Sequence, residues 1–540
     1  MIEPFPGGHP RWAGRDEGIR TRRAESDVSR QRVFLTGATG GMGLVGLNEL
    51  LKDADTRDVV ILARPSERNR ALLAAYAKRP ELIVEWGDLT NYDDVLRCVR
   101  GADVVLHVGA LVSPEADYQA RRAMDVNYGS TMNILTAIGQ CGQAETTKLV
   151  SIGTVAETGD RMPPLHWGRV GDPIKPSVYD YYAVSKVAAE RAVIESGLKR
   201  WVSLRQTGIL SKKMAEIEDA IMFHNCLDNV LEYVSDRDSG VLLRNACGPL
   251  PEEFWNHVYN IGGGAGCRTS TWAMYRELFG SLGITNMENC LDSRWFATRN
   301  FHGHFYLDSD RLEDYLHFRH DSLQYFYDVY LASQGDTARL TRVLCRLPFG
   351  ERVVGRSMKK RFLRSARTEH GTVHFVEDGV EEAIAAYWGS KAAFDAIPRL
   401  NDFAHFTDWD TVVRLDHGYD ESKPESELTL DDVRGAARFR GGVCLADSMA
   451  MGDWRTPLAF RCAFGHQFRA SPRLVLEGGH WCDVCERESW NYPARARRDP
   501  FFAQVWYPLH PVDEPPHVYP KAVDERGVRF GPSQGAKARA

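Results

Sequence analysis

The chain has 540 residues, more than one hydrophobic core usually holds, so its length argues against a single domain and predicts two or three. Hydrophobic residues make up 43% and charged residues 26%, which is the composition of a globular protein with a substantial core. The formal net charge of −6 gives no broad positive field, so bulk charge implies neither nucleic acid nor an anionic membrane as a partner, and it leaves local patches open.

The first segment, residues 1–30, is polar and arginine-bearing, and we expect a disordered arm there. It lacks the apolar run of a secretory signal, and no segment of the chain approaches the ~20 apolar residues of a membrane span. Eleven cysteines, mostly scattered, favour reduced thiols over a disulfide framework. These observations predict a cytoplasmic protein with no membrane partner.

From Arg32 onward, short apolar runs alternate with helical patterns. Strands that alternate with helices of this length indicate right-handed βαβ units, so the predicted fold is α/β with a doubly wound parallel sheet over residues 31–320. The predicted strands lie in VFLTGATGGMG, DVVILARP, ELIVEWGDL, ADVVLHVGA, KLVSIGT, WVSLRQTGIL and HVYNIGGG.

Three further segments differ from this pattern. Residues 321–435 show mainly helical patterns and end in a Pro-, Ser- and acid-rich stretch that is typical of a surface linker. Residues 436–490 form a short module rich in cysteine, glycine and aromatic residues, and residues 491–540 form a Pro- and charge-rich tail. No internal repeat is visible.

The stretch TGATGGMG indicates a nucleotide site. Its glycines have G-x-x-G-x-x-G spacing directly after a predicted strand and at the start of a helix. Glycine there lets the backbone turn tightly and approach a pyrophosphate, whose charge then lies at the helix N-terminus. A glycine turn without a ligand is the alternative. The residues expected to contact the cofactor here are Gly37, Thr39, Gly40, Gly41, Met42 and Gly43.

Two later strand ends support the nucleotide site. Asp88 and Leu89 follow the third predicted strand, where Asp88 is placed to contact the adenine, and Val108, Gly109 and Ala110 follow the fourth, beneath the cofactor. An acidic residue after the second strand would select NAD(H) through the ribose 2′-hydroxyl. The sequence there is ARPSERNR instead. The prediction is therefore NADP(H) in preference to NAD(H), with solvated surface arginines as the alternative, and the phosphate-binding residues would be Arg64, Ser66 and Arg68.

In VYDYYAVSK, Tyr182 precedes Lys186 by four positions, so both side chains lie on one face of a helix. This pair, TGATGGMG, the GDL at 87–89, HVGA at 107–110 and DVN at 125–127 together resemble the extended short-chain dehydrogenase/reductase family, the NAD(P)-dependent epimerase/dehydratase group. The resemblance covers about residues 32–320. It implies a Rossmann domain with a smaller substrate region, a catalytic role for Tyr182 and Lys186 beside the cofactor, and a frequent pairing of two copies into a homodimer.

Free tyrosine has a pKa near ~10, and a nearby ammonium favours the phenolate, so Lys186 is expected to tune Tyr182 for proton transfer during hydride exchange. The resemblance also implies a serine or threonine that hydrogen-bonds the substrate oxygen. Aligned without gaps, the family pattern assigns this role to Thr154 in GTVAETG, with Ser151 as the alternative. Asn127 matches the asparagine that holds a proton relay to the lysine; a helix-capping role is its alternative.

The substrate is not identified by the sequence. The loop 160–173 and the segment 295–304 contain polar and aromatic residues that are candidates for a pocket lining, and each is equally a candidate for an ordinary loop or interface. The candidates in these two segments are His166, Trp167, Arg169, His302 and His304, and Arg205, Gln206 and His224 are further candidates outside them.

Residues 460–485 read FRCAFGHQFRASPRLVLEGGHWCDVC, with a C-x3-H pair and a C-x2-C pair. Two short ligand clusters of this kind suit tetrahedral zinc, and four protein ligands leave no position for a catalytic water, so a structural site is predicted. The segment resembles a zinc ribbon or treble-clef knuckle. The predicted ligands are Cys462, His466, Cys482 and Cys485, with Cys444 and His480 as substitutes.

These features predict an oxidoreductase that interconverts a carbonyl and an alcohol on a small molecule. One alternative is a nucleotide-sugar epimerase or dehydratase with tightly bound NAD, although Glu157 and Asp160 lie off the position of the family's dehydratase carboxylate. A second alternative is a non-catalytic nucleotide-sensing or RNA-associated protein. The absence of an extended basic stripe disfavours nucleic acid as a partner.

Overall fold

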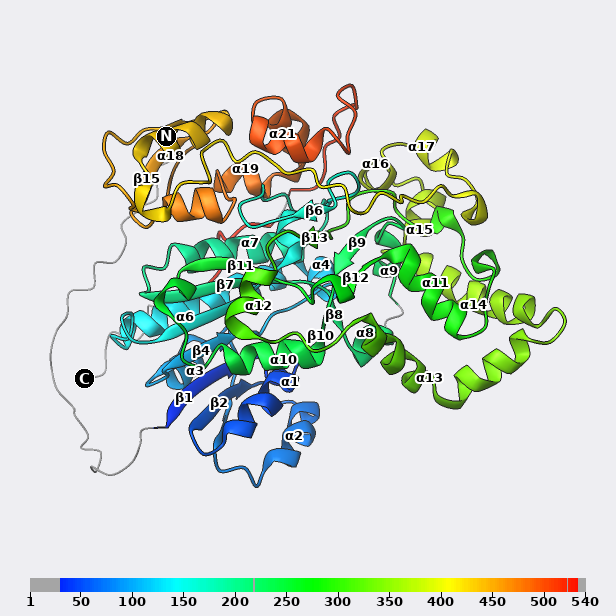
Figure 1. Ribbon diagram of the computed structural model, residues 1–540, viewed down its shortest axis with the longest axis horizontal. Coiled ribbons are helices and arrows are strands. Elements are labelled where there is room, and N and C mark those ends of the chain that lie inside the picture. The colour runs from blue at the N-terminus through cyan, green and yellow to red at the C-terminus, as the bar shows by residue number, and fades with distance from the viewer. Residues whose placement is uncertain (1–29, 217–218, 522, 533–540) are drawn as a thin grey trace.

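The computed structural model describes residues 30–216, 219–521 and 523–532, so the predicted arm lies outside the described residues apart from Arg30. An entirely parallel seven-stranded sheet with order β11-β7-β5-β4-β1-β2-β3 forms the centre of the first half (Figure 1). This is the predicted doubly wound fold, with all seven strands where the sequence indicated. They are β1 (Gln31–Thr36), β2 (Arg57–Ala63), β3 (Leu82–Trp86), β4 (Val104–His107), β5 (Lys148–Thr154), β7 (Arg200–Gln206) and β11 (His257–Ile261).

Helices cover both faces of the sheet. Val33 and Leu35 of β1 point to a face covered by α1 and α10, whereas Phe34 points to a face covered by α3, α6 and α7. Burial on both sides explains why the strands read as continuous apolar runs rather than as alternating ones. The helices are α1 (Gly41–Leu50), α2 (Glu67–Leu73), α3 (Tyr92–Val99), α6 (Gly129–Gln140), α7 (Tyr181–Ile194), α10 (Asp236–Asn245) and α12 (Asp310–Leu316).

The order of the strands locates the functional crevice. β1 lies between β2 and β4, so the chain leaves β1 toward β2 and β3 and then crosses back to β4 on the other side. In such sheets ligands bind where the order reverses, beyond the carboxyl ends of the strands. The glycine loop after β1 and the HVGA segment after β4 lie at this point.

Three two-stranded sheets build the region beyond the carboxyl ends: β8 (Ile209–Leu210) with β10 (Val234–Ser235), β9 (Val230–Glu232) with β12 (Arg268–Ser270), and β6 (Trp167–Gly168) with β13 (Phe305–Tyr306). Short helices accompany them: α4 (Glu115–Tyr118), α5 (Ala120–Ala123), α8 (Lys212–Ala215), α9 (Ile221–His224) and α11 (Thr271–Ser281).

The predicted helical region is present, and residues 321–435, all of them described, contain no strand. Its helices pack on α11 and on the loops of the substrate region around a core that includes Phe223, Trp295 and Phe296. They are α13 (Leu323–Cys345), α14 (Gly350–Ala366), α15 (Thr372–Glu377), α16 (Glu381–Trp388) and α17 (Lys391–Asp395).

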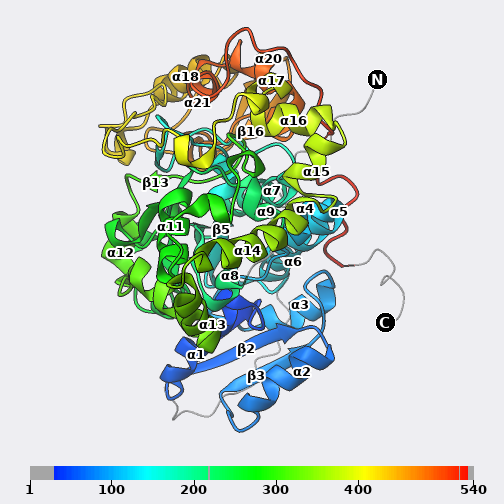
Figure 2. The same ribbon diagram turned by 90° about the vertical axis from the view of Figure 1, so that its right-hand side faces the viewer.

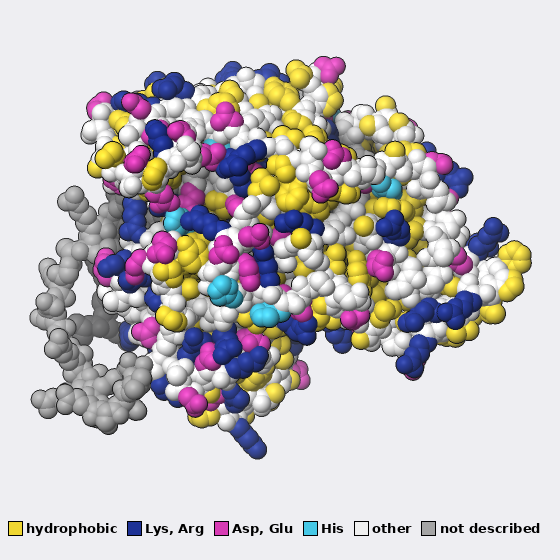
Figure 3. Space-filling model, viewed as in Figure 1, with side chains coloured by type: hydrophobic (Ala, Val, Ile, Leu, Met, Phe, Trp, Pro, Cys, Tyr) yellow, Lys and Arg dark blue, Asp and Glu magenta, His cyan; other side chains and the backbone are white. Residues whose placement is uncertain are grey.

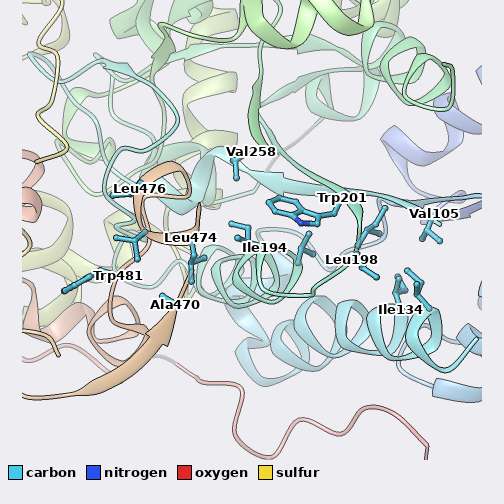
Figure 4. Close-up of a cluster of buried hydrophobic side chains, with 14 of the residues drawn as sticks. Val105, Ile134, Ile194, Leu198, Trp201, Val258, Ala470, Leu474, Leu476 and Trp481 are labelled. Atoms are coloured by element: carbon cyan, nitrogen blue, oxygen red, sulfur yellow. The ribbon is translucent and has the colours of Figure 1, made fainter. Parts of the chain in front are cut away.

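The cysteine-bearing module does not have a core of its own. Leu474, Leu476 and Trp481 pack in the same buried cluster as Ile194 of α7 and Trp201 of β7 (Figure 4). The module therefore extends the layer of α3, α6 and α7 instead of standing apart from it. Its elements are α18 (Leu430–Phe439), the antiparallel strands β14 (Val443–Cys444), β15 (Leu458–Arg461) and β16 (Gln467–Ala470), and α19 (Asp483–Arg487).

The segment predicted as a tail is folded over much of its described length. It forms α20 (Tyr492–Ala496) and α21 (Pro500–Trp506), which bury Phe502 against Tyr492, and further along the Gly531 N–H donates to Asn133 Oδ1 of α6 at 2.9 Å. Figure 2 shows α20 and α21, with α18, at the opposite end of the molecule from α2 and β3. Among the described residues, no helix is long and apolar enough to cross a bilayer.

Candidate active site

The glycine loop is held close to the backbone of β4. Gly37 has φ of +72°, and a side-chain carbon there would lie 2.7 Å from Gly109 Cα. A carbon on Gly43 would lie 2.1 Å from the Gly37 carbonyl oxygen, whereas one on Gly41 would meet open space. Gly37 and Gly43 therefore shape the turn, and Gly40 and Gly41 are exposed at the start of α1, where a pyrophosphate would contact the backbone N–H groups.

A buried network fixes the ends of β1 and β4 beneath this loop. Thr36 Oγ1 accepts from the Gly109 N–H at 2.8 Å and the Val108 N–H at 3.0 Å, and it lies 3.0 Å from His107 Nδ1. His107 Nε2 lies 3.0 Å from Thr131 Oγ1. Burial, together with the charge of Lys186, lowers the pKa of His107 to about 3, so its ring is neutral and positions the two strand ends.

Arg64 and Arg68, which follow β2, are exposed, and within the described residues neither forms an ion pair. Ser66 is the N-cap of α2 and accepts from the Asn69 N–H at 3.2 Å, so its own proton is available to a ligand. The Asp88 carboxylate accepts from the Thr90 hydroxyl in the loop after β3. The Leu89 side chain lies so close to Gly109 that a side-chain carbon on that glycine would be 2.8 Å from Leu89 Cδ1. The residues predicted from these separate strand ends therefore do line one edge of the sheet.

Tyr182 and Lys186 lie on the first turns of α7, below the carboxyl end of β5. The Thr154 side chain lies near enough to the Tyr182 phenol to act on its pKa, and Lys186 Nζ donates to the carbonyl oxygen of Ile152 on β5. Thr154 is also the N-cap of the following turn and accepts from the Ala156 N–H at 3.2 Å. The phenol and the threonine hydroxyl that the family pattern indicated are thus brought to one point.

The charge balance at this point includes buried acids as well as the predicted lysine. Burial raises the pKa of Tyr182 above its ordinary value, and the Thr154 side chain opposes the shift only in part. Burial lowers the pKa of Lys186, while the carboxylates of Glu157 and Glu190 act in the opposite direction. The Lys186 ammonium is directed at a backbone carbonyl and lies near two buried acids.

Asn127 supports α7 from a π-helical turn, η3 (Met124–Tyr128). Its side chain donates to Ser185 Oγ at 2.8 Å and to the Leu111 carbonyl at 2.9 Å, and it accepts from the Leu111 N–H at 2.7 Å. It joins the loop after β4 to the helix that carries the dyad. Asn127 is thus hydrogen-bonded to Ser185 and Leu111, whereas Lys186 donates a hydrogen bond to the Ile152 carbonyl on β5.

A buried charge network continues from the dyad toward the cysteine module. Arg205 of β7 lies 3.4 Å from Glu157 Oε2 and pairs with Glu190, one turn after Lys186 on α7. His480 Nε2 lies 3.1 Å from Glu190 Oε1, and its Nδ1 lies 3.3 Å from Glu486 Oε2. Burial and the charge of Glu190 raise the pKa of Glu157, whereas Arg205 and His480 hold the pKa of Glu190 below its usual range despite burial.

A third acidic group lies at the N-terminus of α7. Asp117 accepts from the Tyr182 N–H at 3.1 Å, and burial together with the charge of Asp180 raises the pKa of Asp117 to about 7. Tyr118, the next residue, stacks on His370 with ring centroids 3.7 Å apart. The added helical region therefore closes over the end of α7 that carries Tyr182. No local sequence pattern predicts this contact, because it joins segments that are far apart in the chain.

Most of the side chains predicted to line a substrate pocket make their contacts away from Tyr182 and Thr154. His166 and Trp167 both contact the carbonyl of Trp409, at 3.0 and 2.9 Å, and Arg169 pairs with Glu421. These side chains hold the loop 160–173 against the segment that leads to the cysteine module. Similarly, Arg205 is buried in the charge network, His224 contacts the His370 carbonyl, and His302 contacts Asp180. His304 is buried, and Gln206 donates to the Thr207 carbonyl.

The four predicted metal ligands come together. Cys462 and His466 lie in the turn of the β15–β16 hairpin, and Cys482 and Cys485 lie at the start of α19. Cys462 Sγ is 3.8 Å from Cys485 Sγ, and His466 Nδ1 is 3.5 Å from the Sγ atoms of Cys482 and Cys485. The substitute ligands lie elsewhere: His480 joins the charge network, and Cys444 is buried in β14.

Residues 33–216 match the NAD dependent epimerase/dehydratase family. The matched segment makes up about a third of the chain, and it contains the glycine loop, Thr154, Tyr182 and Lys186.

Curated relatives match the same part of the chain. The 3 beta-hydroxysteroid dehydrogenase/Delta 5-->4-isomerase of Mycobacterium tuberculosis is 29% identical over 202 residues, which are 36% of this chain and 50% of that protein. The nonribosomal peptide synthetase inpA of Emericella nidulans is 31% identical over 167 residues, 26% of this chain and 11% of that one. The UDP-glucose 4-epimerase of Rickettsia bellii is 27% identical over 109 residues, 19% of this chain and 32% of that one. The chain thus spans half or less of the length of these relatives.

Solved structures are similar to part of the chain. DesIV, a dTDP-glucose 4,6-dehydratase from Streptomyces venezuelae with NAD bound, is 21% identical with a TM-score of 0.45 and covers 56% of this chain and 98% of its own. WbmH from Bordetella bronchiseptica, with NAD⁺, is 17% identical with a TM-score of 0.44 and covers 57% and 99%. The similarity to epimerases and dehydratases rests on the family match over residues 33–216.

The raised pKa of Asp117 predicts a pH-dependent stability. Its pKa is about 7 in the fold and near ~3.9 in the unfolded chain, so the folded state binds the proton more tightly. This contribution is fully present below the unfolded pKa and is lost as the pH rises through about 7. We expect Asp117→Asn to raise the thermal midpoint relative to wild type at about pH 8 and to lose that advantage at about pH 5. The exposed Asp55→Asn serves as control, and equal pH profiles for Asp117→Asn and wild type would contradict the assignment.

Proposed function

We propose that the protein is an NADP(H)-preferring oxidoreductase that interconverts a carbonyl and an alcohol on a small molecule. The observation that carries the proposal is the contact between the Tyr182 hydroxyl and the Thr154 side chain, one helical turn from Lys186 and beside the crevice of the epimerase/dehydratase domain. Two hydroxyl groups at one point suit a single substrate oxygen, which one of them would protonate and the other would orient.

The cofactor site fits a dinucleotide. Gly41 faces open space at the start of α1, and Gly37 brings the loop backbone within reach of a pyrophosphate. NADP(H) would be held by the exposed side chains of Arg64 and Arg68 and by the Ser66 hydroxyl. When bound, the nicotinamide supplies the hydride chemistry.

The protein's own groups would handle the proton. Tyr182 donates its proton to the developing alkoxide, or accepts one in the reverse direction, while Thr154 holds the same oxygen. Lys186 neutralises the charge left on Tyr182, and Glu157 and Glu190 keep an ammonium stable in a buried site, which burial alone would disfavour. Asn127 fixes α7 through Ser185, so that Tyr182 is held in register with Thr154.

Tyr182→Phe removes the proton donor without changing the ring. We expect turnover to fall by about a hundredfold or more, because general acid catalysis is typically worth that much, while affinity for NADPH stays near that of wild type. A panel of ketones and secondary alcohols, including hydroxysteroids and nucleotide sugars, would be followed by the absorbance of reduced nicotinamide.

Tyr181→Phe is the matched control, since this neighbouring phenol lies at the wrong spacing from Lys186 and should retain activity. Turnover by Tyr182→Phe at the wild-type rate would contradict the assigned donor. Conversion of a nucleotide sugar without net change in free reduced cofactor would instead favour an epimerase or dehydratase.

The preference for NADP(H) depends on the two exposed arginines. We expect Arg64→Ala/Arg68→Ala to lower the ratio of NADPH to NADH affinity by roughly tenfold or more, because two charge-assisted contacts with the 2′-phosphate are lost. Arg70→Ala is the matched control, because Arg70 stacks on Trp86 instead. Titration of the protein's fluorescence with each cofactor measures the ratio, and an unchanged ratio would contradict the role.

A structural zinc ion fits the Cys/His cluster. With Zn–S of ~2.3 Å and Zn–N of ~2.0–2.1 Å, tetrahedral ligands lie about 3.8 Å (S to S) and about 3.5 Å (S to N) apart. The distances of 3.8 and 3.5 Å agree with these values. A hairpin turn followed by a helix start is also the geometry of the treble-clef knuckle that the sequence resembles.

Native mass spectrometry should find one zinc ion per chain. Cys482→Ser/Cys485→Ser should lose the ion and lower the thermal midpoint, because the module shares its core with α7 and β7. Cys444→Ser, which changes a buried thiol outside the cluster, should keep the ion. A folded, metal-free wild type would contradict the assignment.

A further inference from the structure

The first two helices of the helical region, α13 and α14, pack together as a hairpin. We define the α13–α14 hairpin as residues 339–367, the last turns of α13, the connection and all of α14. Both helices lie at one end of the long axis of the molecule, at the right in Figure 1. The Phe349 backbone in the connection has φ of +62°, which directs the chain into α14 and leaves the Phe349 side chain 74% exposed.

The hairpin is strongly basic in a protein of net negative charge. It contains ten Lys and Arg residues and a single acidic residue, Glu351, which gives +9 against −6 for the whole chain. Glu351 is already engaged, since it accepts from the backbone N–H groups of Thr285 and Asn286 at 3.1 and 2.7 Å. Among described residues, no carboxylate pairs with Arg346, Arg352 or Arg356.

An apolar stripe runs between these cations. Residues 340, 343 and 344 have the i, i+3, i+4 spacing of one helix face of α13, Leu347 follows in the connection, and all four side chains are exposed. The hairpin packs on the rest of the protein through other residues, including Cys345 and Phe362. Figure 3 shows basic and hydrophobic side chains alternating at this end. The stripe, with its exposed fractions, consists of Leu340 (60%), Val343 (56%), Leu344 (39%), Leu347 (54%), Phe349 (74%) and Val353 (66%).

The combination of positive charge and apolar surface indicates which kind of partner fits the hairpin. A second copy would bring two +9 surfaces together in a symmetric contact, which like charges oppose. Nucleic acid would match the charge and leave the apolar stripe exposed to water. An anionic bilayer satisfies both, because its headgroups attract the cations while the stripe enters the boundary with the acyl chains, and long Arg side chains bridge the two layers.

We propose that the α13–α14 hairpin binds the surface of membranes that contain anionic lipids, with Leu347 and Phe349 inserted at the headgroup boundary. The association is peripheral, since the hairpin carries too many charges to enter the hydrocarbon core. It adds a membrane partner to a chain whose overall charge gave no indication of one, and it does not depend on the proposed reaction.

Sedimentation with lipid vesicles tests the proposal. The full-length protein should pellet with vesicles of phosphatidylcholine containing roughly 30 mol % phosphatidylserine, remain in solution with pure phosphatidylcholine, and be released by roughly 0.5 M salt. Arg352→Glu/Arg356→Glu and Leu347→Ser/Phe349→Ser should each weaken binding at least about tenfold, because one lowers the charge and the other removes the inserted side chains.

Matched controls separate the hairpin from general effects. Lys78→Glu/Arg100→Glu makes the same charge change on exposed residues of the Rossmann part, and Val518→Ser removes an exposed apolar side chain (80% exposed) from the C-terminal segment. Both should bind like wild type, and circular dichroism verifies that every variant is folded. The proposal is overturned if wild type fails to bind anionic vesicles, if the hairpin variants bind equally well, or if the hairpin binds duplex nucleic acid and not vesicles.

Discussion

The active-site geometry depends on the burial of α7 on two sides. One side packs on the parallel sheet, where Val193 and Ile194 join the same cluster as Trp201. The other side meets the cysteine module, where Arg191 donates to the Trp481 carbonyl and Glu190 contacts His480. A helix held in this way cannot shift without disturbing a core and a charge network together, so Tyr182 and Lys186 have a fixed position relative to β5 and Thr154.

Much of the fold was readable in the sequence because each strand is buried on both faces. Runs such as VVIL in β2 and VVL in β4 are apolar throughout because both faces of the sheet are covered. The Cys/His cluster was readable for a similar reason, since its ligand pairs occur at short spacings that depend on local turns. Local patterns of this kind are preserved when the chain folds.

Contacts between distant segments were not readable. Glu190 and His480 are 290 positions apart, and neither has a local pattern that marks it as a partner of the other. The same holds for Tyr118 and His370, which bring the helical region over α7. The candidates around His166 and Arg169 show the converse: polar residues on a loop near a catalytic pair suggest a pocket, yet they hold the loop to another part of the chain.

The shared core has a consequence for how this protein divides into parts. The match to the epimerase/dehydratase family ends at residue 216, but the hydrophobic cluster beneath α7 continues to Trp481 and Cys485. A fragment trimmed to the family boundary would leave Trp201 and Ile194 facing water and would be prone to aggregate. The segment that matches the family is therefore smaller than the unit that shares this hydrophobic core. Recombination that exchanged the catalytic half alone would also need a new segment to cover α7 in place of the cysteine module.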